Sequence, residues 1–135
     1  MKRMMLGLAV ALFISGAAFS AALADDPAMS ANSSLGSILV DAKGMTLYSF
    51  DGDAKGAATS ACTGTCIAAW PPRLAPADAT AAGAWTIVEV TDKDGKPAKM
   101  WAYNGWPLYH FVKDTKAGDV NGDGVGDVWH VVKTP

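Results

Sequence analysis

The chain has 135 residues, with eleven Lys and Arg against thirteen Asp and Glu, so its formal net charge is −2. This balance excludes a basic nucleic-acid-binding protein. Residues 1–24 begin with Lys2 and Arg3, continue with an uncharged apolar run and end in small residues, which is the pattern of a secretory signal peptide. Without them 135 − 24 = 111 residues remain, with nine basic and thirteen acidic side chains and a net charge of −4. That length suits one domain.

The chain beyond residue 24 has no apolar run of the roughly 20 residues that a membrane-spanning helix needs. Its two cysteines, Cys62 and Cys66, lie far from the expected cleavage point, where a bacterial lipid anchor would need one. We therefore expect a periplasmic or secreted protein with no transmembrane segment and no lipid anchor.

Residues 25–34 are small and polar, so we expect a flexible leader before a single domain at 35–135. Alternating apolar residues and Gly, Asn and Asp turns predict six or seven short strands in that domain, and a short helical turn is expected near 66–70, before two prolines. In chain order the strands are expected at 37–42, 45–50, 85–90, 98–103, 106–112 and 128–132. The pattern predicts an all-β, antiparallel sandwich or barrel-like domain.

Two segments of the chain resemble each other. Residues 44–53 and 105–114 share Gly, Leu, Tyr, Phe and Asp at matching positions, and each copy has a Trp about twenty residues after its Tyr. This self-similarity predicts a domain built from two half-repeats, at about 36–72 and 98–133.

The repeated segments resemble a bacterial family of secreted repeats and predicted lipoproteins with a Tyr-x-aromatic-x-x-Asp motif. The motif is matched by Tyr48, Phe50 and Asp53, and again by Tyr109, Phe111 and Asp114. The cysteine segment and the later Trp residues also fit, and the similarity covers roughly residues 36–133. The resemblance implies a fold and export but no activity. The chain departs from the lipoprotein pattern because the anchoring cysteine is missing.

The motif has a structural and a functional interpretation. Residues two apart in a strand point to one face, so each half should form its own Tyr–Phe pair. Asp53 and Asp114 should accept hydrogen bonds from backbone amides of the turns that contain the following lysines. The pairs then either belong to the core or together line a groove for a ligand.

Cys62 and Cys66 are expected to form a disulfide, because the exported environment is oxidising. Such a bond closes a small ring and stabilises the fold by roughly 2 kcal/mol in the chain-entropy model. The alternative is a copper-binding or redox-active thiol pair.

Two further sets of side chains are candidates for a metal site. Oxygen ligands at Asp119, Asn121, Asp123 and Asp127 follow the spacing of a calcium-binding loop, although His130 stands where a bidentate Glu belongs. An ordinary Asp and Gly turn is the alternative. His110 and His130 lie on strands that we expect to be neighbours, where they could bind a transition metal or be partly exposed side chains without a ligand.

Catalytic motifs are scarce in this sequence. Glu89 is the single glutamate, no serine lies in a nucleophile elbow, and no glycine-rich phosphate loop follows a strand. We therefore expect an exported, non-catalytic binding or interaction module without a cofactor, whose partner is an unknown protein or small molecule. The alternative is a periplasmic protein that binds copper, zinc or calcium, or a thiol-redox protein.

Overall fold

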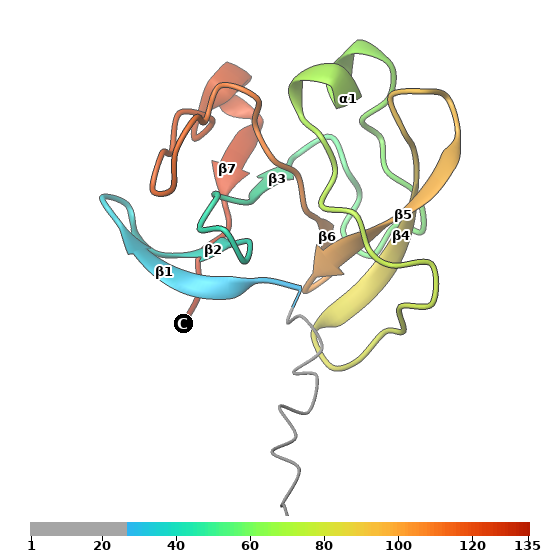
Figure 1. Ribbon diagram of the computed structural model, residues 1–135, viewed down its shortest axis with the longest axis horizontal. Coiled ribbons are helices and arrows are strands. Elements are labelled where there is room, and N and C mark those ends of the chain that lie inside the picture. Colours follow the sequence, from blue (N-terminus) through green and yellow to red (C-terminus); the bar gives the residue numbers. More distant parts are fainter. Residues whose placement is uncertain (1–26) are drawn as a thin grey trace, which may run out of the picture.

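The computed structural model describes residues 27–135, and the predicted signal peptide at 1–24 lies outside these residues. The described part contains seven short strands, one short α-helix and one 3-10 turn (Figure 1). They are β1 (Met29–Ser33), β2 (Gly36–Val40), β3 (Tyr48–Phe50), α1 (Thr65–Ala69), β4 (Trp85–Thr91), β5 (Pro97–Tyr103), β6 (Trp106–Pro107), η1 (Val125–Asp127) and β7 (Trp129–Val131). The predicted all-β class is confirmed, and so is the short helical turn. No helix within 27–135 is long and apolar enough to cross a membrane.

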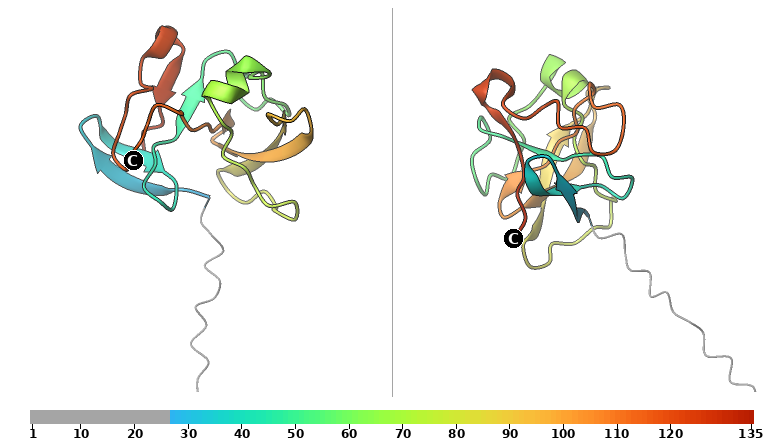
Figure 2. Two further views of the ribbon diagram at one scale, coloured as in Figure 1. Left: turned by 45° about the horizontal axis from the view of Figure 1, so that its top comes forward. Right: turned by 90° about the vertical axis from the view of Figure 1, so that its left-hand side faces the viewer.

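The strands form three small antiparallel sheets, β1–β2, β3–β7 and β4–β5–β6. The first two lie on one side of the molecule and the third on the other (Figures 1 and 2). Tyr48 and Tyr109 join the two sides, because the amide of each donates to the carbonyl of the other, at 2.8 and 2.9 Å. The chain segment after α1 also crosses between them, with isolated bridges from Pro72 to Tyr109 and from Leu74 to Met100.

The hairpins of the three-stranded sheet follow the turn chemistry of the sequence. Asn104 and Gly105 have φ values of 51° and 87°, the left-handed conformation that a two-residue hairpin turn requires. In the turn between β4 and β5, the Asp92 carboxylate accepts hydrogen bonds from the amides of Asp94 and Lys96. These two turns fix the register of β4, β5 and β6.

The predicted flexible leader at 25–34 is wrong for residues 29–33, which form β1. β1 pairs along its whole length with β2, and the Ser33 hydroxyl closes the connecting turn by donating to the Gly36 carbonyl. Its small polar residues gave no strand signal, because its order comes from pairing with β2, whose Ile38, Leu39 and Val40 are buried.

The hairpin predicted between 37–42 and 45–50 is present only near its turn. Asp41 accepts hydrogen bonds from the amides of Lys43 and Met45, and Val40 forms an isolated bridge with Thr46. Further along, β3 turns away from β2 and pairs with β7. The last strand therefore closes the structure beside the first copy of the motif.

A disulfide joins Cys62 to Cys66 with a Cα–Cα distance of 5.3 Å, as predicted. Cys62 is fully buried, and the bond ties the glycine-rich loop to the first turn of α1. Ile67 and Trp70 of this region enter the larger of two buried clusters. The smaller cluster contains Leu39, Leu47, Trp101 and Leu108 beside the three-stranded sheet.

Candidate functional site

The two copies of the motif interlock through their tyrosines and aspartates. The Tyr48 hydroxyl donates to Asp114 Oδ2 at 2.6 Å, and the Tyr109 hydroxyl donates to Asp53 Oδ2 at 2.7 Å. Each tyrosine thus bonds the aspartate of the other half-repeat. Because the four groups are buried, neither half can satisfy its own polar groups alone.

The second oxygen of each motif aspartate binds a loop of its own half. Asp53 Oδ1 accepts from the Ala61 amide at 2.7 Å, and Asp114 Oδ1 accepts from the Asn121 amide at 3.0 Å. These carboxylates accept hydrogen bonds from backbone amides, as expected. The predicted position of the amides is wrong, because they lie seven or eight residues after each aspartate and not in the turns of Lys55 and Lys116. Each aspartate therefore holds a long loop against the core.

The motif aromatics stack across the two halves. Phe50, Trp129, Trp70 and Phe111 form one continuous stack, with ring centroids 4.4, 3.7 and 4.0 Å apart and interplanar angles of 17° or less. Tyr48 meets the Trp70 ring edge-on at 5.5 Å, and Tyr109 meets Trp129 in the same way at 5.2 Å. The expected pairs within each half are therefore wrong. The order of the stack alternates between the halves. Phe50 and Trp129 face each other in the β3–β7 pair, and Phe111 meets Trp70 because the amides beside it, of His110 and Val112, donate to the carbonyls of Pro71 and Ala69.

The motif residues do not form a surface groove, which corrects the functional interpretation of the motif. The side chains of Tyr48 and Tyr109 have no exposed surface, and Asp53 and Asp114 are 3 % and 7 % exposed. Burial, together with the hydrogen bond to the facing aspartate, raises the pKa of both tyrosine hydroxyls well above the usual range. Burial also raises the pKa of Asp53, although its hydrogen bonds from Ala61 and Tyr109 oppose the shift.

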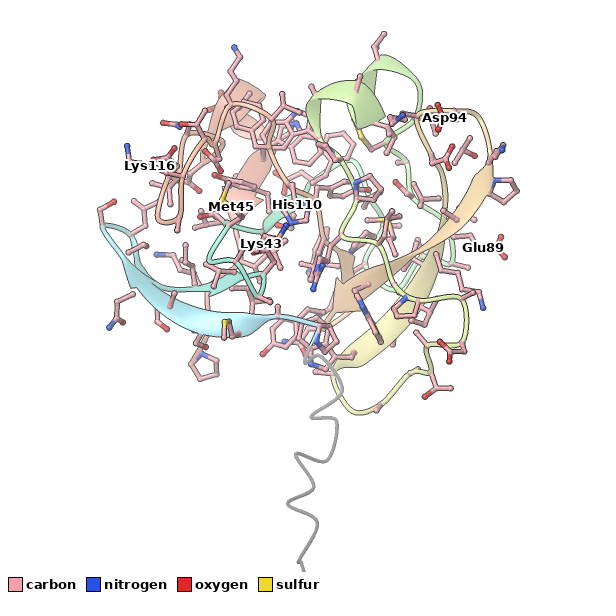
Figure 3. All side chains as sticks on the ribbon, in the orientation of Figure 1. Lys43, Met45, Glu89, Asp94, His110 and Lys116 are labelled. Atoms are coloured by element: carbon pink, nitrogen blue, oxygen red, sulfur yellow. A yellow bond between two sulfur atoms is a disulfide. The ribbon has the colours of Figure 1, made fainter. Side chains whose placement is uncertain are left out.

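The two histidines have separate partners. His110 Nε2 lies 2.9 Å from Asp41 Oδ2, and Figure 3 places this histidine beside Lys43 and Met45. His130 Nε2 lies 2.8 Å from Asp51 Oδ2 on the exposed side of β7. Although burial raises the pKa of Asp41, its hydrogen bonds from Met45, His110 and Lys43 outweigh this effect and lower the pKa overall.

The side chains of the acidic loop bind backbone groups of the neighbouring segments. Asp119 accepts hydrogen bonds from the amides of Thr115 and Lys116, and these bonds lower its pKa despite some desolvation. Asp123 accepts from the amide of Val131, and the Asn121 side chain donates to the Lys113 carbonyl. Asp127 ends η1 with a positive φ of 60°. Within residues 27–135, no three His, Cys, Asp or Glu side chains gather as a metal-binding group.

A cleft of about 690 Å³ opens where the connection between the half-repeats crosses the three-stranded sheet. We call it the linker cleft; its lining comes from Pro27, Ala42 and Trp101 and from residues between 73 and 85. Trp85 meets Trp101 edge-on at 6.1 Å, so two indole rings form an aromatic corner in its wall. A smaller cleft of about 380 Å³ lies beyond Leu74, which lines both and is 50 % exposed.

Arg73 projects from a rigid part of the linker cleft. Its amide donates to the Leu108 carbonyl and its carbonyl accepts from the Trp101 amide, each at 2.9 Å. The side-chain Nε donates to the Pro27 carbonyl at 3.0 Å. Among residues 27–135 the terminal guanidinium nitrogens have no hydrogen-bonding or ionic partner.

The sequence contains a signal for this cleft that motif searches do not use. Arg73 is the single arginine after residue 24, and it directly follows two prolines that keep the chain extended. Trp85 begins a strand after a segment of small residues. Neither feature predicts that Trp101 approaches from the neighbouring strand, because that contact depends on the β4–β5 register.

Comparison with known proteins adds one finding. The model of a family described as a secreted repeat of unknown function, Lipoprotein_15, matches residues 29–73 and 88–133. No curated protein and no solved structure matches the chain. The two matched segments contain both copies of the Tyr–Asp motif, and residues 74–87, which supply most of the cleft wall, lie between them.

Proposed function

The chain belongs to the family of secreted repeats of unknown function, and from this premise we propose that it is an exported, non-catalytic binding module whose ligand occupies the linker cleft. The carrying observation is the cleft itself, whose volume of about 690 Å³ is in the usual range for small-molecule sites. Such sites combine an apolar wall with a few fixed polar groups. The linker cleft offers two indole rings and an arginine whose backbone is held by neighbouring strands.

The repeats and the connection between them have different structural roles, and this difference supports the proposal. The interlocked tyrosines and aspartates are buried, and so are three of the four stacked rings, so they build a frame and present little surface to a partner. Phe50, at one end of the stack, is half-buried. The connection at 74–87 lies outside the matched repeats and carries cleft residues on that frame. Binding residues on a loop held by a rigid scaffold are a common arrangement in proteins.

A pair of surface variants tests the proposal. Leu74→Asp places a charge in the linker cleft, and Val112→Asp is the matched control, because Val112 is 53 % exposed and lines neither cleft described above. Native mass spectrometry of protein purified from its exported compartment should show a bound small molecule on the natural chain and on Val112→Asp, and less of it on Leu74→Asp. A natural chain without added mass, or equal retention by both variants, would contradict the proposal.

The protein's location and a metal function are open to separate tests. Periplasmic release or secretion into the medium remains a prediction, which cell fractionation decides. Metal binding through His110 and His130 or through the acidic loop also remains a prediction, and elemental analysis after dialysis against copper, zinc and calcium tests it. The thiol-redox alternative has the least support, because Cys62 is fully buried and thiol–disulfide exchange needs an accessible sulfur atom.

A further inference from the structure

Arg73 is the positively charged residue in the lining of the linker cleft. Arg73 is half-buried, its Nε is bound to the Pro27 carbonyl, and its terminal N–H groups have no partner within the described residues. A guanidinium in this state is a donor for a planar anion, because its parallel N–H groups match the two oxygens of a carboxylate. Two hydrogen bonds to the Arg73 backbone hold the residue in place, so little order has to be gained on binding.

The other residues that line the cleft indicate what the uncharged part of the ligand should be. Trp85 and Trp101 offer an aromatic corner, while alanine and proline residues supply the adjoining wall. Such a surface gains binding energy from a flat apolar group that packs against the indole rings. The ligand therefore needs an apolar body next to its charged end.

The charges in the cleft limit the ligand's own charge. Asp78 also lines the linker cleft, and it forms no ion pair with Arg73. Arg73 and Asp78 are the charged residues of this lining, so the site has one cation for an anionic group and one carboxylate that repels further negative charge. This balance favours a singly charged carboxylate over a phosphate dianion.

From these features we propose that the linker cleft binds a small organic monocarboxylate with an aromatic or apolar body, with its carboxylate on Arg73 and its body on Trp85 and Trp101. This inference rests on the proposed binding function and names the ligand class for the same site.

The test uses two probes that share one body and differ in charge. Naphthylacetate carries the carboxylate, and naphthylacetamide replaces it with a neutral group of similar size. Isothermal titration of the natural chain should give a Kd for naphthylacetate about tenfold or more below that for naphthylacetamide, as a charge-assisted pair of hydrogen bonds implies.

Three variants assign that difference to Arg73. Arg73→Gln should bind naphthylacetate about tenfold or more weakly than the natural chain and leave the amide within about twofold. Arg73→Lys, which keeps the charge but not the fork, should fall between them and serves if the Gln variant does not fold. Lys93→Gln is the control, because it removes one positive charge at an exposed turn outside the cleft lining and should change neither affinity.

The outcomes separate the two proposals. Equal binding of the two probes, or a Lys variant that binds naphthylacetate as tightly as the natural chain, would overturn the carboxylate inference and leave the cleft as an apolar site. Binding of neither probe to the natural chain would overturn the ligand class, while a different molecule found by native mass spectrometry would still support the binding function. Loss of naphthylacetate binding in Lys93→Gln would show that net charge alone acts, which also contradicts the role of Arg73.

Discussion

Removing the Tyr48 hydroxyl tests whether the half-repeats depend on each other for stability. Tyr48→Phe keeps the ring against Trp70 but removes the bond to Asp114 Oδ2 at 2.6 Å and the bond that the hydroxyl accepts from the Gly122 amide at 3.1 Å. Both partners stay buried, and an unpaired buried group costs about 1–3 kcal/mol. We therefore expect a loss of about 2–4 kcal/mol in the free energy of unfolding.

Thermal and denaturant unfolding followed by circular dichroism measure this loss. At about 4–8 °C per kcal/mol for a domain of this size, the midpoint temperature should fall by roughly 8–32 °C. A double-mutant cycle with Asp114→Asn should give a coupling energy above about 0.5 kcal/mol, because the two side chains share one bond. Tyr109→Phe should behave alike through Asp53.

Tyr103→Phe is the matched control. Tyr103 is half-buried against Trp85 and makes no side-chain hydrogen bond within residues 27–135, so we expect a change of no more than about 0.5 kcal/mol. If Tyr48→Phe were as mild as this control, or if its cycle with Asp114→Asn showed no coupling, the interlocked tyrosines would not hold the halves together.

Three further predictions concern stability. The folded chain keeps the pKa of the Tyr48 and Tyr109 hydroxyls above the unfolded value of about 10, so the free energy of unfolding should be at its full value below that pH and fall above it. Tyrosinate absorbance from these two groups should appear only when the protein unfolds. Its appearance in a folded protein would contradict their burial. Replacing Cys62 and Cys66 with serine should lower the free energy of unfolding, measured with denaturant, by roughly 2 kcal/mol. No loss would show that the loop is stable without the disulfide. Gly122→Ala should lower the unfolding midpoint, because its Cβ would lie 2.8 Å from the Tyr48 ring, whereas an unchanged midpoint would show that the loop can shift away.

Local sequence signals predicted the parts of the fold that depend on neighbouring residues. The Asn104–Gly105 turn and the Cys62–Cys66 pair are set by backbone conformation and by short separation, so composition and spacing were sufficient. β1 was not predicted as a strand because its residues show no alternating apolar pattern. It forms a strand because it pairs with β2.

The hydrogen-bonding partners of residues distant in sequence could not be predicted, even where the residues themselves were identified as motif positions. The repeat identified Tyr48 and Asp114 as motif positions, but self-similarity does not say whether a tyrosine bonds the aspartate of its own half or of the other. The same holds for the linker cleft, where Arg73 and Trp101 are distant in sequence and meet through a backbone hydrogen bond. The repeated motif suggested a ligand site. In the structure it is repeated because each half supplies a buried tyrosine and a buried aspartate that bond the other half.

The measurement that most directly tests the central claim is a titration of isotope-labelled protein with naphthylacetate, followed through the indole N–H resonances of its five tryptophans. If the buried motif is the frame and the linker cleft is the site, the resonances of Trp85 and Trp101 shift with added ligand while those of Trp70 and Trp129 stay in place. Saturable shifts confined to Trp70 and Trp129, or no shift at any indole, would contradict this account.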